Sequence, residues 1–202
     1  MKAGLLLSGG IDSSALAFWK HPPVCFTVDY GQLPATAELS AARSIAAHIA
    51  ARHEVLKIDC SALGSGDLTA KPALAISSTP EWWPYRNQLL VTICATRALE
   101  LGLTDLFIGT VQSDQVHGDG TPQFVTALDQ LLACQEGALR LSAPAIAMTS
   151  LQLIAAAAIP FEILAGTHSC HTGCLACGRC RGCQRRFAAF QALRIEKPAE
   201  LC

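Results

Sequence analysis

The chain has 202 residues, of which 51% are hydrophobic and only 15% are charged, and its formal net charge is −1. This hydrophobic content excludes a disordered chain, and the length predicts one domain with at most a small appendage. A net charge near zero argues against binding to a large nucleic acid, which usually needs a basic surface. Soluble proteins average about 25% charged residues, so this low value indicates a surface buried between subunits, and we expect a homodimer.

The longest uncharged stretch, residues 141–161, has the 21 residues that a membrane-spanning helix needs. Polar residues and two prolines, Pro144 and Pro160, interrupt it and favour a buried strand, loop and helix instead. The apolar run that follows Met1 and Lys2 is too short for the core of a signal peptide. We therefore expect no membrane segment and a cytoplasmic protein.

In chain order, the hydrophobic pattern alternates between short apolar runs, typical of buried strands, and longer amphipathic stretches, typical of helices. Strands are expected at residues 2–7, 24–28, 54–58, 105–108, 139–141 and 161–164. Helices are expected at residues 13–19, 38–51, 89–101, 124–134, 149–157 and 183–193. Two segments rich in turn-forming and polar residues, 61–88 and 110–123, are expected to be irregular.

Strands that alternate with helices predict an α/β fold with a mostly parallel, doubly wound sheet. Right-handed crossovers between the strands place helices on both faces of such a sheet. Ligands then bind beyond the carboxyl ends of the strands. We therefore expect the loops at residues 8–14, 28–32 and 109–123 to meet at one edge of the sheet and to form a ligand site.

The first chemical motif follows the first expected strand and opens the first expected helix. It is the string Ser8-Gly9-Gly10-Ile11-Asp12-Ser13-Ser14. The two glycines let the backbone approach an anion, while serine hydroxyls and free N–H groups at the helix N-terminus can donate to it. The aspartate can cap the helix or help to bind a metal ion. A plain helix cap in a tight turn is the alternative, and the string lacks the Gly-Lys-Ser/Thr ending of a Walker A loop.

This string resembles the pyrophosphate loop of the N-type ATP pyrophosphatases, which have a Rossmann-like fold of the adenine nucleotide α-hydrolase type. Members of that superfamily split ATP between its α and β phosphates and activate acyl substrates as adenylates. The resemblance implies an ATP site in which Mg²⁺ bridges the phosphates. It also implies that the departing pyrophosphate is held by Ser8, Gly9, Gly10, Asp12, Ser13 and Ser14.

The second motif is a cluster of five of the ten cysteines within 14 residues, namely Cys170, Cys174, Cys177, Cys180 and Cys183. Clustered cysteines without an export signal predict metal ligands rather than disulfides. Four thiolates fit a tetrahedral structural Zn²⁺ site; an iron–sulfur cluster and unligated thiols are the alternatives. Four arginines in the same segment either offset the thiolate charge or form an exposed basic surface, namely Arg179, Arg181, Arg185 and Arg186. The isolated cysteines are expected to be small core residues, namely Cys25, Cys60, Cys94 and Cys134.

The two motifs in this order resemble the 7-cyano-7-deazaguanine synthase family over nearly the whole chain. Further strings that match its pattern are Val28-Asp29-Tyr30-Gly31-Gln32, Glu38-Leu39, Trp83-Pro84-Tyr85-Arg86-Asn87, Gly109 with Asp114, and Ser169-Cys170-His171. By this match the metal ligands are Cys170, Cys177, Cys180 and Cys183, and Cys174 is spare. We expect an ATP pyrophosphatase domain at residues 1–165 and a zinc-binding segment with a closing helix at residues 166–202.

The resemblance implies an ATP-dependent carbon–nitrogen ligase. Such an enzyme activates the carboxylate of 7-carboxy-7-deazaguanine, amidates it with ammonia and dehydrates the amide to a nitrile. The residues expected to bind the substrate are Arg86, Asn87, Gly109, Asp114, Asp119 and Phe124. Carboxylates can accept from the guanine-like edge, an aromatic ring can stack on its face, and a guanidinium can hold a carboxylate or phosphate. A solvated loop with two capping aspartates is the alternative. No nucleophile stands out, so positioning and charge stabilisation are expected to supply most of the catalysis.

The chain departs from the family pattern just before Phe124. The family's Tyr-Pro-Asp-Cys-Arg string is read here as His117-Gly118-Asp119-Gly120-Thr121, which retains the aspartate and replaces the arginine. This change leaves open a specialised paralogue that stops at the amide or joins the acid to a peptide or protein amine, as in antiphage systems. A zinc-stabilised nucleotide-binding module without turnover and an RNA-modifying enzyme are further alternatives. The intact loop at residues 8–14 argues against the first of these, and the neutral charge argues against the second.

Overall fold

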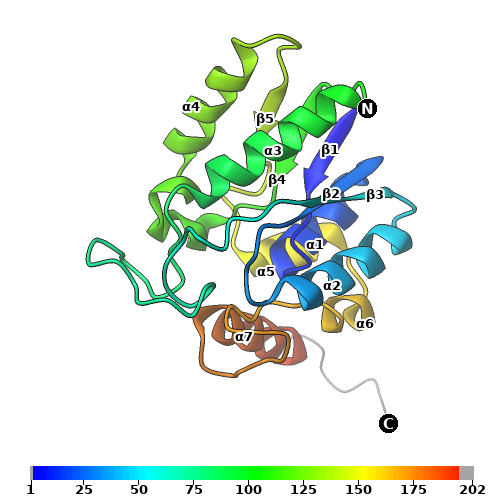
Figure 1. Cartoon of the computed structure of the whole chain (residues 1–202). Coiled ribbons are helices and arrows are strands. Elements are labelled where there is room, and N and C mark those ends of the chain that lie inside the picture. The colour runs from blue at the N-terminus through cyan, green and yellow to red at the C-terminus, as the bar shows by residue number, and fades with distance from the viewer. Residues whose placement is uncertain (1, 196–202) are drawn as a thin grey trace.

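The computed structural model describes residues 2–195 and shows a parallel sheet wrapped by helices (Figure 1). The strands are β1 (Ala3–Leu6), β2 (Val24–Asp29), β3 (Arg52–Lys57), β4 (Asp105–Ile108) and β5 (Arg140–Ser142). Within the described residues they form one five-stranded sheet in the order β3-β2-β1-β4-β5, and each neighbouring pair is parallel. The predicted α/β fold with a doubly wound parallel sheet is confirmed.

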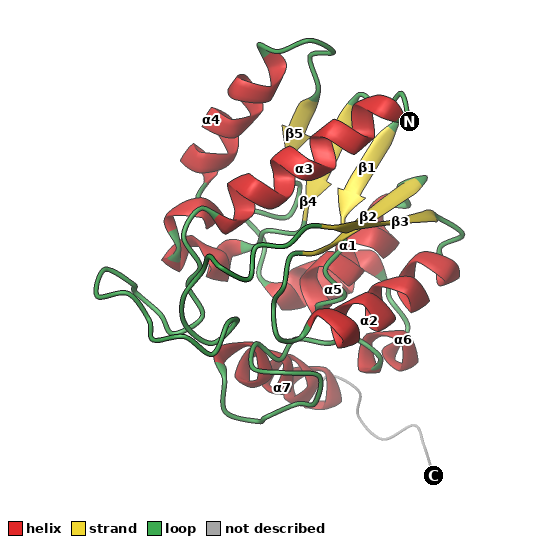
Figure 2. Cartoon of the chain, in the orientation of Figure 1, coloured by secondary structure: helices red, strands yellow, loops and turns green. Residues whose placement is uncertain are grey.

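Helices cover both faces of the sheet (Figure 2). They are α1 (Ile11–Lys20), α2 (Ala35–His48), α3 (Arg86–Glu100), α4 (Pro122–Ala133), α5 (Ser150–Ala157), α6 (Phe161–Ala165) and α7 (Arg181–Ile195). One apolar core packs α3 and α4 on the face that carries Phe26 and Leu106. The other packs α1, α2, α5, α6 and α7 on the face that carries Leu5 and Cys25. Because β1 lies in the middle of the sheet, the loop that follows it is covered by elements from both faces.

The expected strand at residues 161–164 is wrong, because this segment forms the short helix α6. Pro160 precedes the helix, and its carbonyl accepts from the N–H groups of Ile163 and Leu164 at 3.1 and 3.0 Å. A short apolar run can be a buried strand or one turn of a buried helix, and the pattern alone does not separate them. Leu164 is 1% exposed and packs in the core on the sheet face that carries Leu5 and Cys25.

The uncharged stretch at residues 141–161 folds as the predicted strand, loop and helix. It contains the end of β5 and all of α5, whose N-cap Thr149 accepts a hydrogen bond from the backbone N–H of Gln152. Gln152 returns a bond by accepting from the N–H of Thr149, which completes a capping box. Among residues 2–195, no helix is long and apolar enough to cross a membrane.

Three of the four isolated cysteines, Cys25, Cys60 and Cys94, are buried as predicted. Cys134 is exposed, which contradicts the prediction, because it follows the last residue of α4 as its C-cap. The irregular segment between β3 and α3 is anchored by Trp83, which is 3% exposed. Its ring meets Tyr30 edge-on at 5.0 Å between ring centroids. This segment therefore forms a wall beside the carboxyl end of β2.

Candidate active site

A cavity of about 270 Å³ lies at the carboxyl ends of the strands. It is lined by residues from the loop after β1, the end of β2 with the start of α2, the start of α3, the loop after β4, and the segment that leads into α7. The loops expected to meet at one edge of the sheet do so. The walls also include two segments that the sequence did not assign to this site, around Glu81 and at residues 168–185.

The glycine-rich loop after β1 is held by its own serines. The hydroxyls of Ser8 and Ser13 lie 3.0 Å apart, Gly10 N–H donates to Ser8 Oγ at 3.3 Å, and the Ser13 hydroxyl donates to the Gly10 carbonyl at 3.2 Å. Gly9 has a φ of +78°, and a Cβ there would meet the Glu38 carbonyl oxygen at 2.6 Å. Only glycine fits such a position. Ser14 is fully buried, and none of the described residues forms a hydrogen bond with its hydroxyl.

The loop also faces its neighbours at close range. A Cβ on Gly109, which follows β4, would lie 2.8 Å from Ser13 Cα, so the two loops meet backbone to backbone. The N–H of His168 donates to the Gly9 carbonyl at 2.8 Å, which joins the segment before α7 to the loop. Ser8, Gly10, Asp12, Ser13 and Gly109 all line the cavity. The loop therefore presents its backbone and hydroxyl groups to a space closed by two other segments.

Asp12 and Asp114 share one cation. Arg185 donates from Nη2 to Asp12 Oδ2 at 2.9 Å and from Nη1 to Asp114 Oδ1 at 2.7 Å. Asp114 Oδ2 also accepts from the N–H of Val111 at 3.0 Å. Burial raises the pKa of Asp12, and the positive charge of Arg185 opposes this effect. The Ser150 hydroxyl also acts on this carboxylate and lowers its pKa. Among residues 2–195, no group lies at hydrogen-bond distance from the buried Asp12 Oδ1, so this oxygen can accept from or bind a ligand.

Asp119 belongs to the segment between β4 and α4 and packs against the first turn of α3. Its Oδ2 accepts from the N–H of Asn87 at 3.3 Å, and its carbonyl accepts from Asn87 Nδ2 at 3.1 Å. Asp119, Asn87 and Arg86 all line the cavity. Asp119 thus caps a helix while its side chain remains at the cavity wall, so the capping and ligand-binding interpretations are compatible. Phe124 does not line the cavity; it follows the N-cap of α4 and packs against the apolar core.

A buried polar group extends the site behind the end of β2. Gln32 accepts from the N–H of Tyr30 at 2.9 Å and donates to Glu38 Oε2 at 2.7 Å. Burial raises the pKa of Glu38 to about 6, against the hydrogen bond from Gln32 and the charge of Arg86. Both Tyr30 and Glu38 line the cavity. The strings that contain them match the family pattern, and that match was the signal that could have assigned them to the site.

Glu81 joins three segments around the cavity. Its carboxylate, 6% exposed, accepts from Arg181 Nη1 at 2.9 Å and lies 3.4 Å from His117 Nε2. Arg181 also donates from Nη2 to the Ser113 carbonyl at 2.9 Å. Burial of Glu81 opposes ionisation, but the hydrogen bonds from His117 and Arg181 outweigh it and hold the pKa of Glu81 well below its usual value. The first turn of α7 is thereby tied to both flanking loops.

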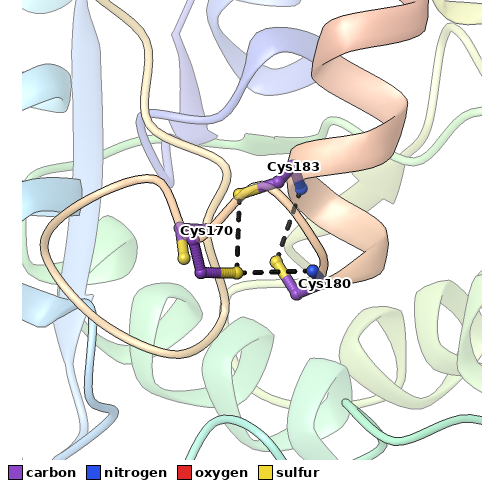
Figure 3. A group of neighbouring side chains, drawn as sticks. Cys170, Cys180 and Cys183 are labelled. Carbon is purple, nitrogen blue, oxygen red and sulfur yellow. Dashed lines mark hydrogen bonds between the residues drawn. The ribbon is translucent and has the colours of Figure 1, made fainter.

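The four cysteines assigned by the family match come together at the start of α7. The sulfurs of Cys170, Cys177, Cys180 and Cys183 all lie within 4.8 Å of one another. Figure 3 shows Cys170, Cys180 and Cys183 grouped where the preceding loop meets α7. Cys177 Sγ and Cys183 Sγ are 3.9 Å apart, close to the edge of about 3.8 Å of a tetrahedron with metal–sulfur bonds of about 2.3 Å. Backbone N–H groups of residues 171, 180 and 183 donate to these sulfurs at 3.3–3.4 Å. The group therefore fits a single metal ion held by thiolates.

The fifth cysteine of the cluster lies outside this group. Cys174 is exposed, and its thiol contacts the Leu33 carbonyl at 3.9 Å. The neighbouring arginines do not share one role. Arg181 and Arg185 point into the cavity, whereas Arg179 is exposed and Arg186 donates to the Ala165 carbonyl at 2.6 Å. The sequence interpretation missed that two of these arginines bind acidic residues of the cavity wall.

The five-stranded parallel sheet, with a glycine-rich loop at the end of its central strand β1, defines a Rossmann-like α/β protein. A family model described as "Queuosine biosynthesis protein QueC" matches residues 2–194. The chain belongs to the QueC family.

Curated relatives agree with this family. The chain is 32% identical to a "7-cyano-7-deazaguanine synthase" of Desulforudis audaxviator over 92% of this chain and 94% of that protein. It is 30% identical to one of Methanothermobacter thermautotrophicus over 99% of both chains. Among solved structures, the U34-tRNA thiolase NcsA from Methanococcus maripaludis, described with its [4Fe-4S] cluster, has a TM-score of 0.54 and 17% identity. The match covers 97% of this chain and 67% of that chain, and it shows the shared fold.

Proposed function

We propose that the chain is an ATP-dependent ligase that activates the carboxylate of 7-carboxy-7-deazaguanine, amidates it with ammonia and dehydrates the amide to the nitrile. One observation carries the proposal: a pyrophosphate-type loop opens into a cavity that also holds Asp119 and Arg86, in a chain of the QueC family. The phosphates would bind at the loop after β1. The deazaguanine would bind toward the start of α3, where a carboxylate can accept from its guanine-like edge.

The chain's own groups supply binding and positioning rather than a covalent nucleophile. Backbone N–H groups at the start of α1 and the hydroxyls of Ser8 and Ser13 can donate to the pyrophosphate as it departs. A bound Mg²⁺ would offset the negative charge of the phosphates. Asp12 would hold this ion, because its Oδ1 is buried beside the loop with no hydrogen-bond partner in the described part of the chain. Glu38 lines the same cavity and its pKa is raised to about 6; in this proposal it accepts the proton that ammonium releases when it becomes the attacking amine.

Zn²⁺ is the metal proposed for the four-cysteine group, and it would stabilise the segment before α7. The sulfur spacing supports a single ion, since a [4Fe–4S] cluster takes one thiolate on each of four irons and needs a wider arrangement. Four thiolates also leave no open position for a catalytic role. Elemental analysis is expected to find one zinc per chain; iron with inorganic sulfide would contradict the assignment.

The ATP chemistry is tested by the products. The chain is incubated with 7-carboxy-7-deazaguanine, ATP, Mg²⁺ and ammonium, and the nucleotides are separated by chromatography. AMP and pyrophosphate are expected. ADP and orthophosphate as the only nucleotide products would refute the pyrophosphatase mechanism. Ser13→Ala removes a hydroxyl of the loop and is expected to lower turnover, whereas Ser40→Ala, on the exposed side of α2, serves as the matched control.

A second candidate is a specialised paralogue that stops at the amide or joins the acid to a peptide or protein amine. The segment that departs from the family pattern favours it, because His117, Asp119 and Gly120 line the cavity. Thr121, which replaces the family arginine, instead caps α4 by accepting from the N–H of Phe124 at 3.2 Å. Mass spectrometry of the product separates the candidates: a nitrile supports the first, and an amide or a peptide adduct supports the second.

A further inference from the structure

Helix α7 presents two arginines to the cavity from one face. Arg181 and Arg185 are four residues apart, so they lie one turn apart on the same side of the helix. Both line the cavity. The next residue, Arg186, faces elsewhere: it donates to the Ala165 carbonyl, and its guanidinium lies 4.4 Å from the centroid of the Phe190 ring. Only part of this basic segment is thus aimed at the site.

The cationic side chains that line the cavity have different surroundings. Among the residues that the structure describes, they are Arg86, Arg181 and Arg185. Arg86 lies at the end with Glu38 and Asp119, whose charges act on it. Arg181 is committed to the buried Glu81 and the Ser113 carbonyl. Arg185 is therefore the cation at the end of the cavity where the glycine-rich loop begins α1.

Arg185 has donors to spare. A guanidinium has five N–H groups, and Arg185 uses one on Asp12 and one on Asp114. Its side chain is 29% exposed, so part of it remains open to solvent beside the cavity. A guanidinium matches the geometry of phosphate oxygens and can bind two of them at once. It can therefore hold a phosphate while it remains on the aspartates.

We propose that Arg185 binds the pyrophosphate portion of ATP opposite the glycine-rich loop, and that the cysteine group at the start of α7 positions it there. This inference rests on the proposed function and adds a phosphate-binding residue to it. A series of contacts connects the cysteine group to α7 and to the glycine-rich loop. Cys180 and Cys183 flank the first turn of α7, and a Cβ on Gly182 would overlap the Ser169 carbonyl, so helix and preceding loop are in direct contact. His168 in turn bonds to Gly9 of the glycine-rich loop.

The test measures binding of Mg²⁺-pyrophosphate to the full metal-loaded chain by calorimetry. Arg185→Gln removes the charge but keeps donors for the two aspartates. It is expected to weaken pyrophosphate binding roughly 10- to 150-fold, the range for a lost charged hydrogen bond. Arg185→Lys is expected to restore part of that affinity. Arg179→Ala, an exposed arginine of the same segment, is the matched control and is expected to bind as the wild type does.

A charge-matched double variant distinguishes two roles of Arg185: direct contact with the phosphate, and neutralisation of the aspartates that would otherwise repel it. Asp114→Asn with Arg185→Gln keeps the net charge of the group formed by Asp12, Asp114 and Arg185. If Arg185 contacts the phosphate, the double variant still binds pyrophosphate weakly; recovery of wild-type affinity would overturn the inference. Zinc content and thermal unfolding, measured for each variant, identify any variant that fails to fold, and Arg185→Lys then carries the comparison.

The outcomes also separate this inference from the proposed function. Wild-type binding of ATP and pyrophosphate, with equal binding by Arg185→Gln, overturns the role of Arg185 and leaves the proposed function standing. A wild-type chain that binds neither ligand contradicts both. Affinity for AMP, which lacks the pyrophosphate portion, is expected to be unchanged in Arg185→Gln, and an equal loss for AMP would show that the substitution acts through the fold of the cavity.

Discussion

Glu38→Gln replaces the partly buried carboxyl at the start of α2 with a neutral group of the same shape. The amide oxygen can still accept from Gln32, so the substitution changes mainly the charge. Burial raises the pKa of this carboxyl from an ordinary 4.5 to about 6. A raised pKa means that the folded chain favours the protonated acid. The stability that this preference supplies is complete below about pH 4.5 and is lost as the pH rises through 6.

The magnitude follows from the two pKa values. A difference of about 1.5 in pKa corresponds to about 2 kcal/mol at about 1.36 kcal/mol per pKa unit. Part of this change has already occurred at pH 5, so the free energy of unfolding of Glu38→Gln, relative to wild type, should rise by about 1 kcal/mol between pH 5 and pH 8. The stability of the Gln variant relative to the wild type is thus expected to increase as the pH rises.

Urea denaturation of both chains at pH 5 and pH 8 measures this difference. The comparison cancels effects common to both chains, including protonation of the cysteine group at low pH. Glu162→Gln, on the exposed surface of α6, is the matched control and should show no such trend. The reasoning would be refuted if the wild type became more stable relative to Glu38→Gln between pH 5 and pH 8, since ionised Glu38 would then stabilise the fold.

Three further tests concern the four-cysteine group, the end of the cavity proposed to bind the deazaguanine, and the contact between Gly109 and the glycine-rich loop. Cys183→Ser should lower metal content and the unfolding temperature because metal-binding energy is also folding energy, while Cys174→Ser keeps both; metal loss in Cys174→Ser would mean a different set of ligands. Asp119→Asn retains an acceptor for its helix cap and should weaken binding of 7-carboxy-7-deazaguanine by roughly 10- to 150-fold in calorimetry; unchanged affinity removes it from the site. Gly109→Ala places a Cβ 2.8 Å from Ser13 Cα and should cost about 1–3 kcal/mol in urea denaturation and weaken ATP binding; wild-type ATP affinity would contradict this contact.

The centre of the sheet was predictable because β1 and β2 are buried on both faces and appear as apolar runs. The edge strand β3 is only partly buried, and its signal is the alternation of apolar and polar residues. Residues 105–108 were assigned without error, and most other elements differ from expectation only at their ends. The failure at residues 161–164 has a physical cause. Three apolar residues and one glutamate after a proline are compatible with a short strand and with a helical turn. Packing against elements distant in sequence decides between the two.

The site was predictable where a local string carries its chemistry. The glycine-rich loop at residues 8–14 lines the cavity. The four cysteines that the family resemblance implied as metal ligands come together in a separate group. The partners of Arg181 and Arg185 were not predictable, because each salt bridge joins residues at least 71 positions apart in the chain. Phe124 was assigned to the substrate from its place in the chain, but helix α4 turns its ring toward the core.

The contact between Asp12 and Arg185 joins residues 173 positions apart in the chain, and this has a consequence for the order of folding. The last strand, β5, ends at Ser142, so the sheet and the helices on its α3 side can form before the segment at residues 168–185 docks. Contacts of large sequence separation carry the greatest loop-closure cost and form late. Because residues 168–185 follow all five strands in the chain, the cavity side of the glycine-rich loop stays open to solvent until this segment has docked.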